Sequence, residues 1–191
     1  RSGAKVEKKK LKQWFLKITD FAEDLINDLN QLSGWPENVK TMQLNWIGRS
    51  EGTEIKFKIK NSNESITVFT TRPDTLYGST YLVLAPDHPL AKQLITEKNK
   101  NRFYDFKYKI STLSETDRTS ENKEKQGMFI GSYAINPAND REIPIWIADY
   151  VLSSYATGAV MGVPAHDQRD YDFAKKYKLE ISYVIYNQKT K

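Results

Sequence analysis

The chain has 191 residues, with 29 Lys and Arg against 24 Asp and Glu, which gives a formal net charge of +5. Because 39% of the residues are hydrophobic and none is cysteine, a wholly disordered chain, a disulfide scaffold, a thiolate metal site and a cysteine nucleophile are excluded. No stretch approaches the roughly 18 apolar residues of a membrane helix, and the N-terminus lacks the apolar run of a signal peptide, so we expect a soluble protein with no membrane partner. The missing cysteines permit a reducing compartment, and the location we expect is the cytoplasm. The sequence begins at Arg1 rather than Met, and we interpret it as a piece of a longer protein.

The first periodic segment lies between Leu11 and Leu32, where apolar residues recur at three- and four-residue steps. This spacing predicts an amphipathic helix of more than five turns, ended by Gly34. Its apolar stripe would face either its own domain or a neighbour outside the chain. Residues 38–47 are expected to form a short helix or a turn.

From Thr53 onward the apolar period changes to two, which predicts a β-hairpin over residues 53–71 with its turn at Asn61–Asn63. Further strands are expected at 80–85, 128–135, 143–147, 158–163 and 181–186. Helices are expected at 89–100 and 167–177, and the polar stretch 107–126 is expected to be a mobile surface excursion. Many short strands with inserted helices indicate a mixed α/β fold, a closed or nearly closed β-barrel decorated by helices and preceded by the long helix.

Standard catalytic and cofactor motifs are missing from the sequence. Two histidines, far apart in the chain and without cysteine, make a poor metal site, so no metal is expected. A G-x-x-x-x-G-K-[ST] loop does not occur, and no cofactor is predicted.

Two segments gather polar side chains beside strand ends. In Thr70–Gly78, TTRPDTLYG, a strand breaks at a proline and presents hydroxyls and backbone N–H groups that suit a small polar ligand. In the second segment, an apolar strand ends at Pro164 and a helix begins at Asp167, with Asp167 and Asp170 on one helical face. Both segments also have purely structural explanations: a proline turn in the first, and in the second an N-cap with a carboxylate near the positive helix end.

The two segments together resemble a known family. The pair TTRPDTLYG and GAVMGVPAHDQRDYDFA is similar to the editing domain inserted in class I aminoacyl-tRNA synthetases for branched aliphatic amino acids, and its details are closest to the bacterial leucyl type. Upstream, LKQWFLKITDFAEDLI, WPENVKTMQ and NWIGRSEG resemble the segments before this insertion. The resemblance implies two parts: residues 1–47, a helix and linker from the parent enzyme body, and residues 48–191, the editing domain. Ala156 departs from the glycine usual at this position of the family.

The resemblance implies a hydrolase that cleaves the ester of tRNA-Leu carrying a wrong amino acid, such as norvaline, isoleucine or methionine. A second, hydrolytic site is needed because one methylene gives an apolar pocket only about 1–3 kcal/mol of discrimination. The implied partners are the 3′ acceptor end of that tRNA and the remainder of the parent synthetase. The family places its H-x-G-H and K-M-S-K-S motifs outside this insertion, and neither occurs here, so this chain is not expected to activate leucine. No side chain is an obvious general base, so we expect water to be positioned by threonine, backbone groups and the neighbouring ribose hydroxyl.

The same resemblance implies roles for individual residues. Asp170 would pair with the α-ammonium of the substrate, assisted by Asp167, and Thr75 would exclude leucine. The resemblance assigns a place at the ester and ribose region of the substrate to Thr70, Thr71 and Arg72. It assigns a place in the substrate-binding wall to Tyr155, Met161, Val163 and His166.

Three alternatives stay open at this level. The chain could be a tRNA-end or protein-binding module without turnover, although a pure binder would not need Thr70, Thr71, Thr75 and Asp170 together. It could instead be a valyl-type editing domain with threonyl-tRNA as its substrate. The basic, aromatic stretch 97–109 could touch the tRNA acceptor end or simply form a solvated surface helix.

Overall fold

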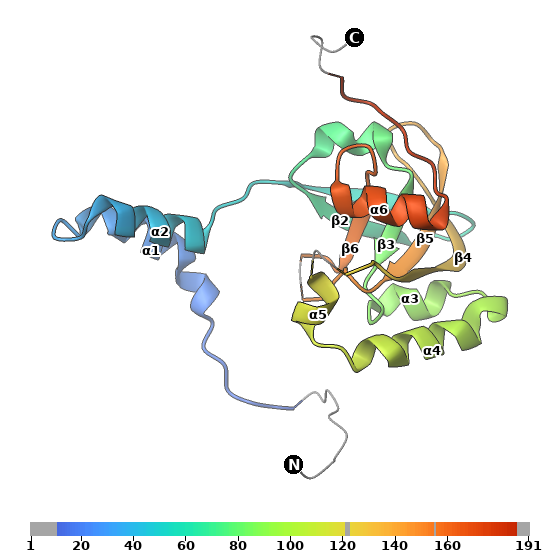
Figure 1. Ribbon diagram of the computed structural model, residues 1–191, viewed down its shortest axis with the longest axis horizontal. Coiled ribbons are helices and arrows are strands. Elements are labelled where there is room, and N and C mark those ends of the chain that lie inside the picture. The colour runs from blue at the N-terminus through green and yellow to red at the C-terminus, as the bar shows by residue number, and fades with distance from the viewer. Residues whose placement is uncertain (1–10, 121–122, 155, 187–191) are drawn as a thin grey trace. The chain divides into compact units, whose positions relative to one another are not determined.

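The computed structural model describes residues 11–120, 123–154 and 156–186. The chain divides into two compact units, one at Lys9–Glu51 and a larger one in which Gly52 onward forms the sheet and its helices. Figure 1 shows the helices and strands of both units. Each unit is described below by itself.

The smaller unit consists of short helices. They are η1 (Ile18–Phe21), α1 (Ala22–Asp28), η2 (Leu29–Gln31) and α2 (Glu37–Ile47). The predicted helix of more than five turns is therefore wrong: residues 11–17 are not helical, and the rest is divided between 3₁₀ and α segments. A helix in a protein is stabilised mainly by packing of its apolar face, and in this unit only Leu29 is buried among the described residues. Of the two alternatives expected at 38–47, a short helix or a turn, the structure has the helix, α2, with Gly48 as its C-cap.

The larger unit is built on one six-stranded mixed sheet in the order β2-β1-β4-β5-β3-β6. The strands are β1 (Thr53–Ile59), β2 (Ser65–Thr70), β3 (Tyr81–Leu84), β4 (Gly127–Ile135), β5 (Glu142–Ala148) and β6 (Ala159–Gly162). Strands β3 and β5 pair in parallel, and the other neighbours are antiparallel. The predicted hairpin is confirmed, with Ile55 opposite Val68 and Phe57 opposite Ile66.

The mixed α/β class is confirmed, but the sheet is not closed. Cα atoms of the two edge strands, β2 and β6, come within 8 Å of one another, yet the two strands are not hydrogen-bonded neighbours in the sheet. A bulge between Phe129 and Tyr133 bends β4, and Gly131 within it has a φ of +98°. The predicted barrel is therefore a strongly curled open sheet.

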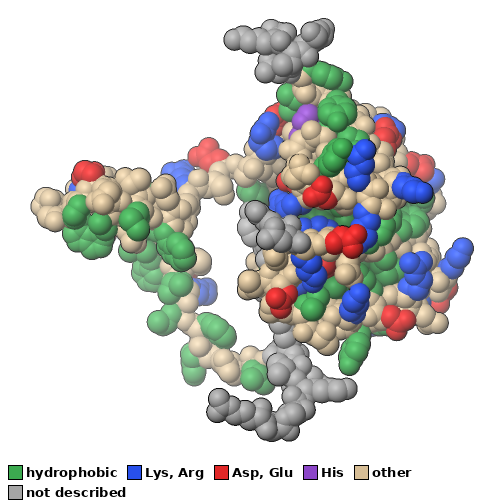
Figure 2. Space-filling model, in the orientation of Figure 1, with side chains coloured by type: hydrophobic (Ala, Val, Ile, Leu, Met, Phe, Trp, Pro, Cys, Tyr) green, Lys and Arg blue, Asp and Glu red, His purple; other side chains and the backbone are tan. Residues whose placement is uncertain are grey.

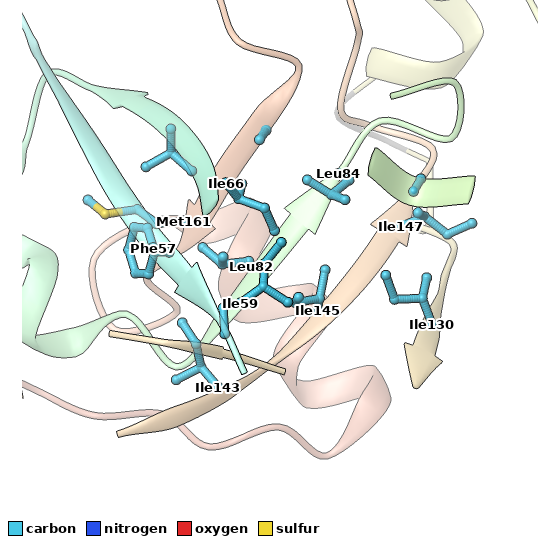
Figure 3. Packing of buried hydrophobic residues seen from close by; sticks show 14 of the residues in the cluster. Phe57, Ile59, Ile66, Leu82, Leu84, Ile130, Ile143, Ile145, Ile147 and Met161 are labelled. Carbon is cyan, nitrogen blue, oxygen red and sulfur yellow. The ribbon is translucent and has the colours of Figure 1, made fainter. Parts of the chain in front are cut away.

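Strand β3 contributes to two hydrophobic cores, because successive side chains on a strand point to opposite faces. Leu82 and Leu84 lie in the larger core, whereas Tyr81 and Val83 lie in the smaller one. Figure 3 shows how the larger core packs side chains from several strands against one another. All four residues of β3 are buried, as expected for a central strand covered on both faces.

Helices cover both faces of this sheet (Figure 1). They are α3 (Pro89–Leu94), α4 (Lys100–Ser111), α5 (Glu115–Thr119) and α6 (Gln168–Tyr177), with the 3₁₀ segments η3 (Pro73–Gly78) and η4 (Glu97–Asn99). Ala91 of α3 and Phe103 of α4 pack into the larger core, and Phe173 of α6 packs into the smaller one. The helix expected at 89–100 is shorter than predicted, because the backbone is extended at Ile95.

Two further expectations are wrong. The stretch 107–126 is not simply a surface excursion, because it contains the end of α4 and all of α5, and the side chains of Arg118 and Lys125 are buried. Residues 181–186 form no strand, although Val184 packs close to Gly78. This segment is held partly by side chains: the Thr80 hydroxyl donates to the Glu180 carbonyl at 2.8 Å.

The surface of the larger unit carries charges of both signs. Figure 2 shows Lys and Arg side chains intermixed with Asp and Glu on the visible face. The basic stretch 97–109 forms η4 and α4, in which Tyr104 and Tyr108 are exposed and Lys100 pairs with Glu97 at 3.1 Å. In the described ranges, no helix has the length and apolar character needed to cross a membrane.

Candidate active site

A cavity of about 410 Å³ opens beside the ends of β2 and β6 and the start of α6. It is large enough for a small-molecule group and combines apolar walls with a few convergent polar side chains. Its lining consists of Phe69, Thr70, Thr71, Arg72, Thr75, Tyr150, Val151, Leu152, Val160, Met161, Val163, His166, Asp167, Arg169 and Asp170.

The first polar segment leaves β2 through a tight turn. The Thr70 hydroxyl accepts a hydrogen bond from the Arg72 backbone N–H at 3.0 Å, so its own proton remains available to a ligand. Pro73 then starts η3, and its fixed φ suits the first position of a helical turn. Arg72 forms a two-pronged ion pair with Asp74, at 3.2 and 3.0 Å, on the exposed side of this turn.

Thr75 is the buried residue of this turn, with 1% of its surface exposed. Its hydroxyl donates to the Arg72 carbonyl at 2.8 Å, and its backbone N–H donates to the same oxygen at 3.1 Å. These bonds fix the χ1 angle of a β-branched side chain that is already stiff. Thr75 therefore presents a rigid surface to the cavity.

The second polar segment connects β6 to α6. Asp167 is the N-cap of α6, and its Oδ1 accepts from the backbone N–H groups of Arg169 and Asp170 at 2.9 and 3.1 Å. The structural explanation for Asp167 is thus confirmed. The Asp167 carboxylate also pairs with the Arg169 guanidinium at 3.2 Å, which brings a cation to the cavity wall.

Asp170 lies near the positive end of α6 and also accepts hydrogen bonds from two other elements. Its carboxylate is 6% exposed; Oδ2 accepts from the Val163 N–H at 2.9 Å, and Oδ1 accepts from the Tyr150 hydroxyl at 3.2 Å. The three residues come from α6, the end of β6 and the connection after β5, so Asp170 joins three elements. Two acceptor positions are used, and a carboxylate has about four.

The pKa values of the two carboxyl groups are moved in opposite directions. Burial, followed by the negative charge of Asp167, raises the pKa of Asp170 to about 6. Burial also disfavours ionisation of Asp167, but the hydrogen bonds from Arg169 and from the backbone outweigh it and lower the pKa of Asp167. At neutral pH both groups are anionic, and the Asp170 charge is the more easily neutralised.

Tyr81 supports this arrangement from β3. Its hydroxyl donates to the backbone carbonyl of Asp170 at 3.1 Å, and its ring stacks on Phe173 at 5.5 Å. A Cβ at Gly162 would lie 2.4 Å from the Tyr81 ring, so only glycine lets the ring approach β6 this closely.

The structure brings almost the whole predicted site together. Nine residues named from the sequence line the one cavity: Thr70, Thr71, Arg72, Thr75, Met161, Val163, His166, Asp167 and Asp170. The tenth, Tyr155, lies outside the described residues. The sequence interpretation missed Tyr150 and Arg169; Arg169 stands inside the D-Q-R-D motif and could have been found there, whereas nothing local marks Tyr150.

Apart from Asp170, the groups of the described cavity lining that could accept a proton, His166 and Asp167, are already engaged by other parts of the chain. The Nε2 atom of His166 accepts from the Val184 N–H at 3.4 Å, and Asp167 is engaged by α6 and Arg169. In the described ranges, no three Asp, Glu or His side chains gather to hold a metal ion.

Known proteins share this sequence and fold. The profile of the family "Leucyl-tRNA synthetase, editing domain" matches residues 44–191. A leucine–tRNA ligase of Prochlorococcus marinus (strain SARG) is 66% identical over 97% of this chain and 21% of its own length. That of Nostoc sp. (strain PCC 7120) is 58% identical over 97% of the chain and 21% of its own.

Among solved structures, the LeuRS–tRNA–LeuAMS ternary complex of Agrobacterium radiobacter K84 superposes with a TM-score of 0.79 at 40% identity, covering 96% of this chain and 22% of that one. The chain thus spans about a fifth of the length of these relatives. The valyl-type alternative is set aside, because both the profile and these relatives are of the leucyl type. With this sequence match and its mixed α/β fold, the chain belongs to the leucyl-tRNA synthetase editing-domain family.

Proposed function

We propose that the cavity hydrolyses the ester bond between a noncognate amino acid and the 3′ end of tRNA-Leu. The observation that carries the proposal is the buried Asp170 carboxylate, which lies in a largely apolar cavity and has unused acceptor positions. An aminoacyl ester carries an α-ammonium that matches this carboxylate. Such a charge-assisted hydrogen bond is worth about 1.5–3 kcal/mol.

The rest of the lining suits the remaining parts of the substrate. Met161 and Val163 offer apolar surface to an aliphatic side chain and the terminal adenine, while Thr70 and Thr71 offer hydroxyls to the ester and ribose. Arg169 brings a positive charge to the wall of a site whose substrate is a polyanion.

In the proposed reaction, water attacks the ester carbonyl carbon and the carbonyl–ribose oxygen bond breaks. The products are the free amino acid and tRNA with a free ribose hydroxyl, which takes up a proton. Because Asp170 is occupied by the ammonium, the threonine hydroxyls and the neighbouring ribose hydroxyl orient the water and stabilise the developing oxyanion. Since charged tRNA is made and used in the cytoplasm, the reaction belongs there.

Deacylation of tRNA-Leu charged with norvaline, isoleucine or methionine, compared with correctly charged leucyl-tRNA, tests this function. We expect the mischarged tRNAs to be hydrolysed faster than they decay spontaneously, and leucyl-tRNA to resist. Binding of mischarged tRNA without any acceleration would instead identify a binding module without turnover. Leucine-dependent pyrophosphate exchange by this chain would contradict its assignment to editing alone.

We also propose that the smaller unit is a segment of the parent synthetase body and that the editing domain begins near residue 48. Large apolar side chains gather along this unit (Figure 2), and Trp14 and Trp46 are exposed by 102% and 88%. Exposed apolar surface of this extent is typical of an interface with another part of a protein.

A chain of residues 48–191 should keep the folded sheet and its hydrolytic activity, while aggregating less than the 191-residue chain. Loss of the sheet's cooperative unfolding in the shorter chain would contradict the boundary.

A further inference from the structure

Arg118 is a buried cation that does not line the cavity. Its side chain donates hydrogen bonds to backbone carbonyls of a segment that does line the cavity. Arg118 lies in α5, is 8% exposed, and donates from Nε to the Asp149 carbonyl and from Nη2 to the Val151 carbonyl, each at 2.8 Å. The two acceptors are the carbonyls of the residues on either side of Tyr150. A planar guanidinium donates to two such carbonyls from a rigid fork, whereas the three donors of an ammonium rotate about a single nitrogen atom.

Arg118 donates to the carbonyls of Asp149 and Val151, and Tyr150, which lies between them, contacts Asp170. Tyr150 and Val151 line the cavity, and the Tyr150 hydroxyl donates to Oδ1 of Asp170 at 3.2 Å. Residues 149–151 have a further contact with the 107–126 stretch, because Oδ1 of Asp149 accepts from the Gln126 N–H at 2.9 Å. The Asp149 N–H also donates to the Gln126 carbonyl at 2.9 Å, so the described part of the 107–126 stretch makes four hydrogen bonds to the connection after β5.

We propose that Arg118 is a positioning residue of the hydrolytic site: it fixes the backbone around Tyr150, and Tyr150 in turn holds the Asp170 carboxylate toward the substrate ammonium. The inference rests on the proposed function for its role in hydrolysis, but the link from Arg118 to Asp170 is a property of the chain alone. The residue acts from a polar segment that contributes no side chain to the cavity lining among the described residues.

The alternative is that Arg118 merely anchors α5 to the sheet. Lys125 provides the matched control, because it is a second buried cation of the same stretch, 6% exposed, whose Nζ donates to a backbone carbonyl at 2.6 Å. That carbonyl belongs to Ser120, within the stretch itself. Lys125→Met thus removes a buried charge and a carbonyl hydrogen bond without releasing Tyr150.

The test is a carbon-13 NMR titration of the Asp170 carboxyl group in the 191-residue chain, without tRNA. The variants are Arg118→Lys, which keeps the charge but loses the fork, Arg118→Met, Tyr150→Phe and Lys125→Met. Loss of the Tyr150 hydrogen bond removes an interaction that favours the ionised carboxylate, so Tyr150→Phe and both Arg118 variants should raise the pKa of Asp170 by about one pH unit. The resonance reports Asp170 itself, separately from the other polar groups near it: Asp167, Arg169, Tyr81 and His166.

Lys125→Met should leave the Asp170 titration unchanged, and Arg118→Lys should add nothing to the shift in a Tyr150→Phe background. In deacylation of norvalyl-tRNA, Arg118→Lys should lose about 10-fold in kcat/KM, with the acid limb moved to higher pH, because small misplacements of a site are costly. An Asp170 titration that moves no more in Arg118→Lys than in Lys125→Met overturns the inference.

The outcomes separate the two proposals. If the unaltered chain hydrolyses no mischarged tRNA, the proposed function fails, and the NMR titration still decides whether Arg118 controls Asp170. If hydrolysis occurs but the Arg118 variants titrate like the unaltered chain, the inference fails while the function stands. If Arg118→Met does not fold, Arg118→Lys is used for both the NMR titration and the deacylation assay.

Discussion

Asp170 sets the pH range in which the proposed reaction operates. Its carboxyl must be ionised to pair with the ammonium, and burial raises its pKa to about 6. We therefore expect kcat/KM for norvalyl-tRNA, corrected for spontaneous hydrolysis, to fall as the pH drops below about 6, since kcat/KM reports groups of the free enzyme. Asp170→Asn should abolish this limb along with most activity. Asp167→Asn should keep the limb but move it to lower pH, because the Asp167 charge contributes to raising the pKa of Asp170.

Ionisation of Asp170 also lowers the free energy of unfolding. In the unfolded chain Asp170 titrates near its ordinary value of 3.8, whereas in the folded chain burial raises the pKa. The resulting contribution to stability is complete below pH 3.8 and is lost as the pH rises through about 6. Urea unfolding at a series of pH values should show this loss in the unaltered chain relative to Asp170→Asn. A difference in unfolding free energy that is flat between pH 4 and 7 would contradict it.

Thr75 is expected to determine which amino acid enters the cavity. Leucine branches at Cγ, norvaline is unbranched and isoleucine branches at Cβ, so leucine must be rejected by an obstacle at the γ-branch. Thr75→Ala removes the methyl and hydroxyl of a rigid side chain and should allow hydrolysis of leucyl-tRNA while norvalyl-tRNA is still cleaved. Thr75→Val keeps the branched shape and should still spare leucyl-tRNA, as a deacylation time course would reveal. Resistance of leucyl-tRNA to Thr75→Ala would place the obstacle at another residue.

At the scale of elements, the connection between β5 and β6 carries backbone strain at Ala156. This residue has a φ of +47°, a left-handed conformation in which a Cβ is unfavourable by about 1–2 kcal/mol. Glycine loses more entropy on folding, so Ala156→Gly should raise the free energy of unfolding by up to about 1 kcal/mol. Gly158 has a φ of +69°, and Gly158→Ala should lower the same quantity. Chemical denaturation of both variants measures the two effects, and a destabilised Ala156→Gly would mean that the turn is not strained.

The elements that the sequence predicts well are those with local signals. The hairpin follows from alternation of apolar residues, and α6 follows from a capping Asp167 with an apolar face. The periodicity of segment 11–32 predicts a long helix because it identifies an apolar face, but periodicity does not reveal whether a partner is there to bury that face. The polar composition of 107–126 predicts an exposed stretch, yet Arg118 and Lys125 are buried and donate to backbone carbonyls.

The site shows the same division. Its polar residues stand in two compact motifs, so they could be named from the sequence, and the fold brings them to one cavity. The role of Tyr150 depends on the pairing of distant strands and on a hydrogen bond to Asp170 across 20 positions of the chain. No local pattern encodes such a contact, because it is set by tertiary packing.

At the scale of the whole sheet, β3 is shared by both hydrophobic cores. It pairs with β5 and β6, and a hydrogen bond from the Thr80 N–H to the Gly162 carbonyl, at 3.1 Å, extends its contact with β6. Because both cores pack against this strand, we expect that opening of one core alone does not release its amides. Their hydrogen exchange should proceed only through global unfolding and respond fully to urea, whereas amides of the exposed helix α2 should exchange through local fraying.

The shared strand also has a kinetic meaning. Because β5 pairs with β3 across an intervening stretch of more than fifty residues, β3 is completed only after distant parts of the chain have met. We therefore expect β3 to be completed late in folding, with both cores becoming stable in the same step and the cavity between the ends of β2 and β6 forming with them. A newly made chain is therefore expected to acquire its proposed hydrolytic site in one cooperative event.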